Sequence, residues 1–188
     1  MTLSPRFSEA LVYAAALHAE QRRKASGVPY IAHLLGVAAI ALEYGADENE
    51  AIAALLHDAI EDQGGAATRE EIRRRFGLEV VAIVDGCTDS DVLPKPPWRQ
   101  RKQAYVARLP EASAAVRLVA AADKLHNARS ILSDYRVHGE ALWQRFRAGR
   151  DGTLWYYRAV VAALRQAGAN PLVEELARTV GEIERLVS

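Results

Sequence analysis

The sequence predicts an all-α protein, a single domain over residues 1–188 built as a bundle of about eight to ten helices. Apolar residues recur at helical spacing along almost the whole chain, and no set of segments shows the strict alternation typical of β-strands. Half of the residues are hydrophobic, with abundant Ala and Leu but only 12 Gly and 7 Pro. A chain of this length can bury a core without disulfide bonds.

The charge balance and the cysteine content exclude several classes of protein. The 24 Lys and Arg residues cancel the 24 Asp and Glu residues, so bulk charge does not favour binding of nucleic acid. The one cysteine, Cys87, cannot form an internal disulfide and fits a reducing compartment. Met1–Phe7 lacks the pattern of a signal peptide, and no apolar stretch is long enough to cross a bilayer. We therefore expect a cytoplasmic protein that acts on a small molecule, without membrane or nucleic-acid partners.

The first helices are predicted from apolar spacing, capping residues and helix breakers. The first helix ends near Glu20, and its apolar residues are Phe7, Ala10, Leu11, Ala14 and Leu17. Pro29 suits the first position of a second helix, which runs to about Tyr44 and stops at the glycine that follows. Asp47 is suited to cap a third helix that carries residues 51–60 and that the Gly64-Gly65 pair breaks.

The rest of the chain continues the helical pattern. Thr68 and Glu71 match a capping box for a short helix that ends at Gly77. The β-branched stretch 78–84 is compatible with a strand or a helix, and its helical neighbours favour a helix. Three prolines mark 89–97 as a loop. Further helices are expected over residues 98–109, 112–133, 140–148, 153–166 and 171–187.

Four titratable residues interrupt the apolar third helix, namely His57, Asp58, Glu61 and Asp62. His57 and Glu61 share one helix face, and Asp58 and Asp62 share the adjoining face. Burying such groups without partners costs on the order of several kcal/mol each. The pattern therefore predicts a polar cleft, and the alternative is a solvated helix end that frays toward Gly64.

Two other segments place polar residues in apolar surroundings. His33 stands among apolar residues of the second helix, where a lone histidine is more often a satisfied core residue than a ligand. Asp123 ends an apolar run in which only Arg117 is polar, and a buried aspartate needs a cation or several hydrogen bonds. Asn127 lies one turn later on the same face.

Together these segments supply two imidazoles and two carboxylates as candidate metal ligands: His33, His57, Asp58 and Asp123. Mixed nitrogen and oxygen ligation suits Mn²⁺, Fe²⁺ or Zn²⁺ and leaves positions open for water. Water on such an ion loses a proton readily and becomes a nucleophile. Glu61 and Asp62, one turn away, are candidates for orienting that water or exchanging protons with it.

With these residues the sequence resembles the HD-domain phosphohydrolases, and more narrowly the small alarmone hydrolases and the hydrolase half of RelA/SpoT-type proteins. The matching motifs occur in the family's order over about residues 7–132. They are Gln21-Arg22-Arg23-Lys24, Pro29-Tyr30-Ile31-Ala32-His33, His57-Asp58, Glu61-Asp62, Phe76-Gly77, Gly86-Cys87-Thr88-Asp89, Arg101-Lys102 and Ala122-Asp123-Lys124-Leu125-His126-Asn127-Ala128-Arg129.

The resemblance implies that residues 1–188 form one HD-type phosphohydrolase domain that hydrolyses the 3′-pyrophosphate of (p)ppGpp to GDP or GTP plus pyrophosphate. It implies one Mn²⁺-type ion on the four candidate ligands and water activation by Glu61 and Asp62. It assigns substrate contacts to Arg23, Lys24, Asn127 and Ser130. The chain departs from the long enzymes in the 24–27 loop, which is one residue longer, and at Lys124, where they carry Arg.

Two other functions fit the same residues. One is a phosphatase for another nucleotide, such as NADPH or a nucleoside phosphate, because metal-activated water does not choose the base. The other is a nucleotide sensor without catalysis, which has no need for both the ligands and the acidic pair. Two aromatic segments stay open: Trp98–Lys102 is a lid over phosphates or a surface helix, and Trp155–Tyr157 reads as core.

Overall fold

The computed structural model describes residues 2–23, 26–90, 92 and 94–188. This part of the chain forms nine α-helices and two short 3-10 helices, with one isolated β-bridge between Arg22 and Pro29, so the all-α prediction is confirmed. The α-helices are α1 (Pro5–Leu17), α2 (Ile31–Glu43), α3 (Glu48–Leu56), α4 (Ala59–Asp62), α5 (Ala66–Cys87), α6 (Trp98–Arg108), α7 (Ala114–His138), α8 (Gly149–Gln166) and α9 (Pro171–Leu186). The 3-10 helices are η1 (Leu109–Glu111) and η2 (Gly139–Arg145).

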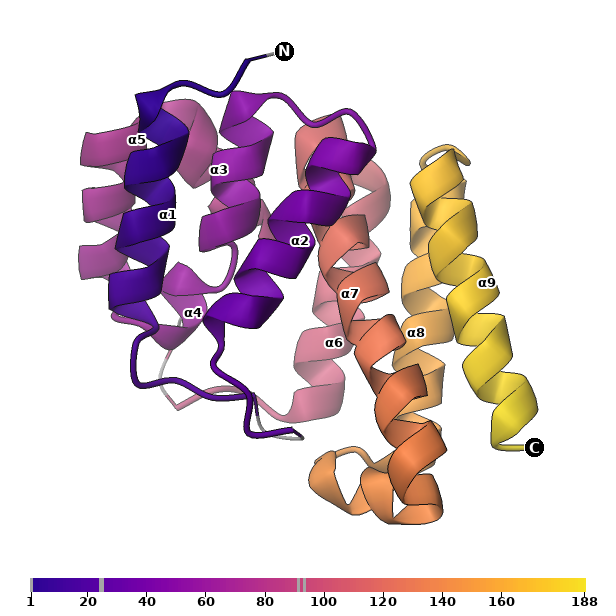
Figure 1. The fold of residues 1–188 in the computed structure, drawn as a ribbon. Helices are drawn as coiled ribbons and strands as arrows, with labels where there is room; N and C mark the ends of the chain where they lie inside the picture. Colours follow the sequence, from indigo (N-terminus) through magenta and orange to yellow (C-terminus); the bar gives the residue numbers. More distant parts are fainter. Residues whose placement is uncertain (1, 24–25, 91, 93) are drawn as a thin grey trace.

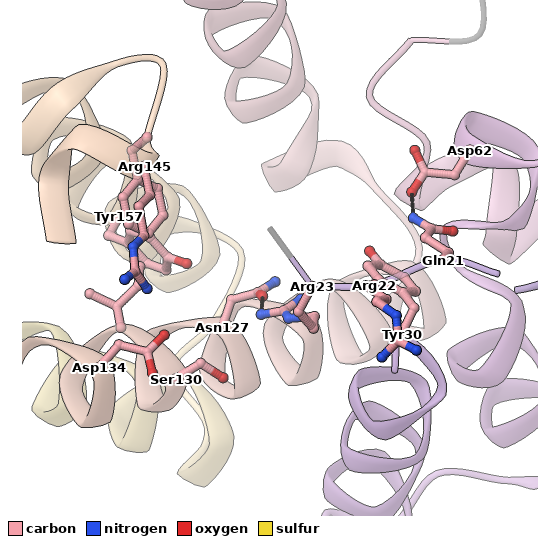
Figure 2. Close-up of a pocket in the computed structure, with 12 residues that line it drawn as sticks. Gln21, Arg22, Arg23, Tyr30, Asp62, Asn127, Ser130, Asp134, Arg145 and Tyr157 are labelled. Atoms are coloured by element: carbon pink, nitrogen blue, oxygen red, sulfur yellow. Dashed lines mark hydrogen bonds between the residues drawn. The ribbon is translucent and has the colours of Figure 1, made fainter. Parts of the chain in front are cut away.

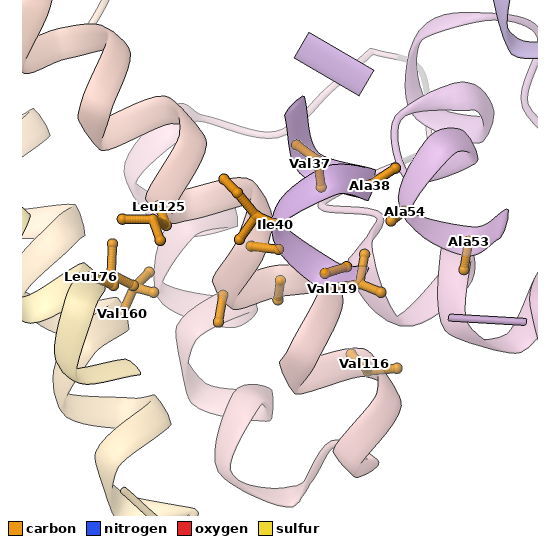
Figure 3. Close-up of a cluster of buried hydrophobic side chains, with 14 of the residues drawn as sticks. Val37, Ala38, Ile40, Ala53, Ala54, Val116, Val119, Leu125, Val160 and Leu176 are labelled. Atoms are coloured by element: carbon orange, nitrogen blue, oxygen red, sulfur yellow. The ribbon is translucent and has the colours of Figure 1, made fainter. Parts of the chain in front are cut away.

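The long helix α7 is the centre of the bundle (Figure 1). It packs against α2, α3 and α5 on one side and against α9 on the other. Small side chains such as Ala38 and Ala54 are fully or almost fully buried where α2 and α3 meet α7 (Figure 3). Because these residues need little room, the three helices approach closely, and polar residues on them are brought together. Among the residues described, no helix is both long and apolar enough to span a membrane.

Helix α3 begins as predicted but ends earlier. The Asp47 side chain accepts from the amide of Glu50, and the Glu50 carboxylate accepts from the amide of Asp47, which completes a capping box. The expected helix through residue 60 is wrong, because α3 ends at Leu56 and α4 starts at Ala59. The ring nitrogen Nδ1 of His57 bonds to the carbonyl of Ala54 at 2.8 Å. In a continuous helix that carbonyl accepts from the amide of residue 58.

Three other boundaries also differ from the prediction. Pro29 is not helical, because the segments around it and Arg22 pair through backbone hydrogen bonds, and α2 starts at Ile31. Thr68 is no N-cap, because α5 begins at Ala66 and the Thr68 hydroxyl donates to the carbonyl of Gln63. The predicted helix 140–148 is instead the 3-10 helix η2.

Expectations for α5, α6 and α8 are confirmed. Gly77 interrupts α5 with φ 89° and ψ 175°, a conformation that favours glycine, and the stretch 78–84 is helical. Residues 98–108 form a helix, and Tyr156 and Tyr157 are buried as core residues of α8.

Candidate metal centre and substrate cavities

The four predicted ligands meet where α2, α7 and the end of α3 approach one another. His33 comes from α2, His57 and Asp58 from the turn between α3 and α4, and Asp123 from α7. The Nε2 atom of His33 lies 3.6 Å from Asp58 Oδ2 and 3.3 Å from Asp123 Oδ1. The Nε2 atom of His57 lies 3.0 Å from Asp58 Oδ2 and 3.6 Å from Asp123 Oδ1. We call these four residues the cation cluster.

The donor atoms of the cation cluster fit a divalent metal ion. The rings of His33 and His57 are 1% and 3% exposed, yet the Nε2 atom of each lacks a hydrogen-bond partner among the described residues. Ligand atoms of His33, His57 and Asp58 all lie within 4.8 Å of one another. Buried nitrogen atoms without partners are costly unless a ligand satisfies them. Two imidazole nitrogens beside two carboxylates match the mixed ligand set of a transition metal.

Hydrogen bonds on the far side of each ring set its tautomer. The carbonyl of Ala54 can only accept, so His57 carries its proton on Nδ1 and turns the lone pair of Nε2 toward the cluster. His33 Nδ1 lies 2.9 Å from His126 Nδ1, which accepts a hydrogen bond from His33 Nδ1–H when His33 Nε2 is a ligand. Burial, followed by the neighbouring charges of His33 and Arg23, lowers the pKa of His126 to about 4, so this ring is a neutral acceptor at pH 7.

A glycine makes room for His126. A Cβ atom at Gly36 on α2 would lie 2.2 Å from Cδ2 and 2.3 Å from Nε2 of the His126 ring. These distances are too short for any side chain, and His126 reaches His33 only because position 36 has none.

The electrostatics of the cluster favour charged ligands. Burial opposes ionisation of Asp58, but the His57 and His33 rings outweigh it and hold the pKa of this carboxyl well below its ordinary value. Burial also raises the pKa of Asp123, but Lys124 and His33 outweigh it and hold this pKa well below its ordinary value. Burial alone lowers the pKa of His57, but the two carboxylates outweigh it and raise the pKa well above its ordinary value. A proton on Nε2 of His57 would therefore compete with a bound cation.

The acidic pair of α4 lies beside the cation cluster. Glu61 and Asp62 line the same cavity of about 240 Å³ as Asp58 and Asp123, and we call this space the acidic cavity. Glu61 accepts from Lys95 Nζ at 2.8 Å, so its carboxylate is directed toward the loop before α6. Asp62 accepts from Gln21 at 2.8 Å (Figure 2), and burial followed by the charge of Asp58 raises the pKa of Asp62.

A second cavity of about 300 Å³ adjoins the acidic cavity (Figure 2). The two share Arg23, Tyr30, Asp62 and Asn127 as lining residues. Arg23 donates to the side-chain oxygen of Asn127 at 2.6 Å, and Asn127 in turn donates to Asp123. Ser130 lines only the second cavity of these two, and its hydroxyl donates to the carbonyl of His126. Lys24 lies outside the described residues.

The sequence assigned no definite role to Tyr30 or Lys102, which line these cavities. The Tyr30 hydroxyl donates to Asp58 Oδ2 at 2.6 Å, and burial raises the pKa of Tyr30, so the hydroxyl remains a donor. Lys102 of the Trp98–Lys102 segment lines the acidic cavity, which favours a contact with phosphate over a purely surface helix for this segment. The position of Tyr30 within the motif that ends at His33 was the available signal for this residue.

Comparisons with known proteins define the class of this fold and site. Residues 10–154 match a family model described as an HD domain. This match spans most of the chain, and the protein therefore belongs to the HD domain family, as the motifs predicted. Nine α-helices in the described residues agree with that all-α fold.

More narrowly, the chain is similar to animal enzymes of one name. The guanosine-3′,5′-bis(diphosphate) 3′-pyrophosphohydrolase MESH1 of Xenopus tropicalis is 43% identical over 126 residues, which cover 65% of this chain and 68% of that protein. The Drosophila melanogaster protein of the same name is 35% identical over 170 residues, or 89% of each chain. A solved structure titled as a metazoan ortholog of SpoT that hydrolyses ppGpp matches with a TM-score of 0.81 and 31% identity, over 100% of this chain and 99% of its own.

Proposed function

We propose that this protein is a metal-dependent hydrolase that cleaves the 3′-pyrophosphate of (p)ppGpp, giving GDP or GTP plus pyrophosphate. The observation that carries the proposal is the cation cluster, next to a pair of joined cavities. In it, two buried imidazole nitrogens that make no hydrogen bond within the described ranges face two carboxylates. The names of the similar proteins, which act on guanosine bis(diphosphate), support this choice of substrate.

The proposed cofactor is one divalent ion, Mn²⁺, on His33, His57, Asp58 and Asp123. When bound there, it would polarise a phosphate oxygen and lower the pKa of water. The Tyr30 hydroxyl and the amide of Asn127 each donate to one carboxylate of this set, which fixes the ligand oxygens in place.

Glu61 and Asp62 are proposed to position and activate the attacking water. Lys95 and the amide of Asp89 both donate to the Glu61 carboxylate and fix its direction. The raised pKa of Asp62 brings this carboxyl closer to neutral pH, which suits a group that takes a proton in the reaction. Water gives its proton to this pair as its oxygen bonds to the phosphorus attached to the ribose, and the ribose 3′-oxygen leaves and is protonated.

The second cavity is proposed to hold the nucleoside. Arg23 and Lys24 are assigned to the guanine base and nearby groups, Asn127 to the ribose, and Ser130 to an assisting hydrogen bond. The position of Arg23 and Asn127 on the wall that both cavities share supports this assignment, because a ligand that spans the wall must touch them. We further propose that residues 1–188 act as one domain on a free nucleotide in the cytoplasm, without nucleic acid.

The test is a panel of ppGpp, pppGpp, NADPH and simple nucleotides, assayed with Mn²⁺ and with a chelator. Pyrophosphate released from ppGpp and pppGpp in a metal-dependent reaction is the expected result. The Asp58→Ala variant provides the inactive control. Release of free phosphate from NADPH, with no cleavage of ppGpp, would replace this proposal with a nucleotide phosphatase.

A further inference from the structure

Two buried tyrosines that line the acidic cavity carry hydroxyls with no partner among the described residues. Tyr105 of α6 and Tyr156 of α8 are 2% and 6% exposed, and the hydroxyl of neither makes a hydrogen bond to any described residue. Both side chains line the same cavity as Asp58 and Asp123. A buried hydroxyl without a partner destabilises a protein unless something else satisfies it. Phenylalanine would fill the same space without that cost, so the two hydroxyls indicate a ligand.

Two lysines lie against the rings of these tyrosines. Lys124 Nζ is 5.3 Å from the ring centre of Tyr105 and 6.0 Å from that of Tyr156. Lys102 Nζ is 4.9 Å from the ring centre of Tyr156. Each ammonium makes one described hydrogen bond, Lys124 to Asp123 and Lys102 to Asp89. An ammonium has three N–H donors, so both lysines keep donors for a ligand.

The charge of this part of the cavity favours an anion. Asp89 binds both Lys102 and Arg101, and Glu61, which lies 4.0 Å from Arg101, also binds Lys95, so three cations face two carboxylates there. The second oxygen of Asp89, Oδ1, is buried without a partner among the described residues. It would repel an anion in the cavity, and the neighbouring cations must offset this repulsion. Burial raises the pKa of Tyr105 well above its ordinary value, so its hydroxyl keeps its proton and remains a donor.

We propose that Tyr105, Tyr156, Lys102 and Lys124 form a subsite for the terminal phosphate of the substrate's 3′-diphosphate. This proposal rests on the proposed function and names the part of the substrate that the rest of the site leaves unassigned. Two hydroxyl donors and two ammonium groups suit a terminal phosphate, which carries several charged oxygens. Lys124 connects the subsite to the cation cluster, because it binds Asp123 and contacts both rings.

The subsite predicts a preference for a 3′-diphosphate over a 3′-monophosphate. Water bonds to the phosphorus attached to the ribose, the bond from that phosphorus to the 3′-oxygen breaks, and the electron pair and a proton go to the 3′-oxygen. The bond between the two phosphates stays intact, and they leave together as pyrophosphate. Contacts to the terminal phosphate therefore fix the position of the reacting phosphorus without taking part in bond cleavage. A 3′-monophosphate has no group to place there.

The first experiment compares Tyr105→Phe, Tyr156→Phe and the double variant with wild type on ppGpp and on guanosine 5′-diphosphate 3′-monophosphate. For the double variant we expect kcat/KM on ppGpp to fall about tenfold to a hundredfold, the worth of hydrogen bonds to a charged group. We expect kcat/KM on the monophosphate to change less than about twofold. Tyr135→Phe is the matched control, because its hydroxyl bonds to Glu140 outside the cavity. Equal loss on both substrates would overturn the subsite.

The thermal midpoint separates binding from packing. Because neither hydroxyl has a partner among the residues that the structure describes, the Phe variants should melt at the wild-type temperature or above it while losing activity. A residue with a purely structural role would lose both together. Loss of activity that merely follows a fall in Tm would count against the proposal.

A binding experiment keeps the subsite distinct from the proposed reaction. Calorimetry in Mn²⁺ should show tighter binding of inorganic pyrophosphate than of inorganic phosphate to the wild type, and the double variant should lose this preference. If the wild type fails to cleave ppGpp but keeps a preference that the double variant loses, the proposed function fails and the subsite stands. If the double variant binds pyrophosphate like the wild type, the subsite is refuted even in an active enzyme.

Discussion

Polar groups around the acidic cavity and polar groups on the outer surface of α8 and α9 are arranged in opposite ways. Around the cavity many are buried, and His33, His57 and Tyr105 each keep a polar atom that has no partner in the described part of the chain. On the surface, exposed arginines pair with glutamates, as Arg158 does with Glu184. Exposed ion pairs contribute little stability, whereas buried unpaired groups reduce it. The buried set is therefore the part of the molecule whose chemistry needs an explanation outside folding, and a ligand supplies one.

The largest expected effect in this comparison is that of Asp58→Ala. Removing this carboxylate takes away one proposed ligand and leaves two histidine nitrogens facing a poorer site, so Mn²⁺ binding and hydrolysis should both be abolished. Metal content per chain and release of pyrophosphate from ppGpp are the measurements. Asp151→Ala, at a 90% exposed side chain, is the control and should behave like wild type. Wild-type turnover by Asp58→Ala would discard the metal assignment.

Glu61→Ala should separate ligation from water activation. This residue lies in the cavity but bonds to Lys95 and the amide of Asp89 rather than to the cation cluster. We expect metal content to stay at the wild-type level while kcat falls by about 10²- to 10⁴-fold, the usual worth of a general acid or base. If metal content falls together with the rate, Glu61 is a metal ligand and belongs to the cation cluster.

Mn²⁺ affinity should depend on pH because a proton competes with the metal for His57. The pKa of His57 is raised in the absence of a cation, so proton and metal compete for the same Nε2 atom. Below this pKa, Mn²⁺ affinity should fall as the pH falls, by about tenfold per pH unit for one displaced proton, and above it affinity should be constant. Calorimetry in buffers of different ionisation enthalpy measures the protons released. Affinity that does not change with pH would show that the ring is already unprotonated.

The smallest effect is expected on the surface. Arg158→Ala breaks an exposed pair with Glu184 and should change the free energy of unfolding by less than about 1 kcal/mol, because solvent screens such pairs. Hydrolysis should be unchanged. Urea unfolding and the ppGpp assay check these two points. A large loss of activity would contradict the view that this surface ion pair takes no part in hydrolysis.

Much of the fold and the cluster was predictable because the signals are local or occur as motifs. Helical spacing and the Asp47 cap were read correctly, and residues that lie as far apart as His33 and Asp123 were expected to meet. The break after Leu56 was missed because it depends on the direction of the His57 ring, which bonds to the carbonyl of Ala54. Apolar spacing carries no information about such a bond.

The two tyrosines illustrate a second limit. Tyr105 and Tyr156 lie on different helices, and each fits an apolar helix face as well as phenylalanine does. Only the packing of α6 and α8 shows that both residues line one cavity and that their hydroxyls lack a partner in the part of the chain that the structure describes. Sequence reasoning left Trp98–Lys102 undecided for the same reason, since the position of Lys102 depends on a neighbouring helix.

The missing side chain at Gly36 has a consequence for how this chain can change over generations. Any larger residue there displaces the His126 ring, which supports the ligand His33 from behind. Positions 36 and 126 therefore cannot drift independently: a bulkier residue on α2 is tolerated only alongside a smaller one on α7, and that exchange removes the support from His33. A single hydrogen atom at one position thus constrains a residue 90 positions further along the chain.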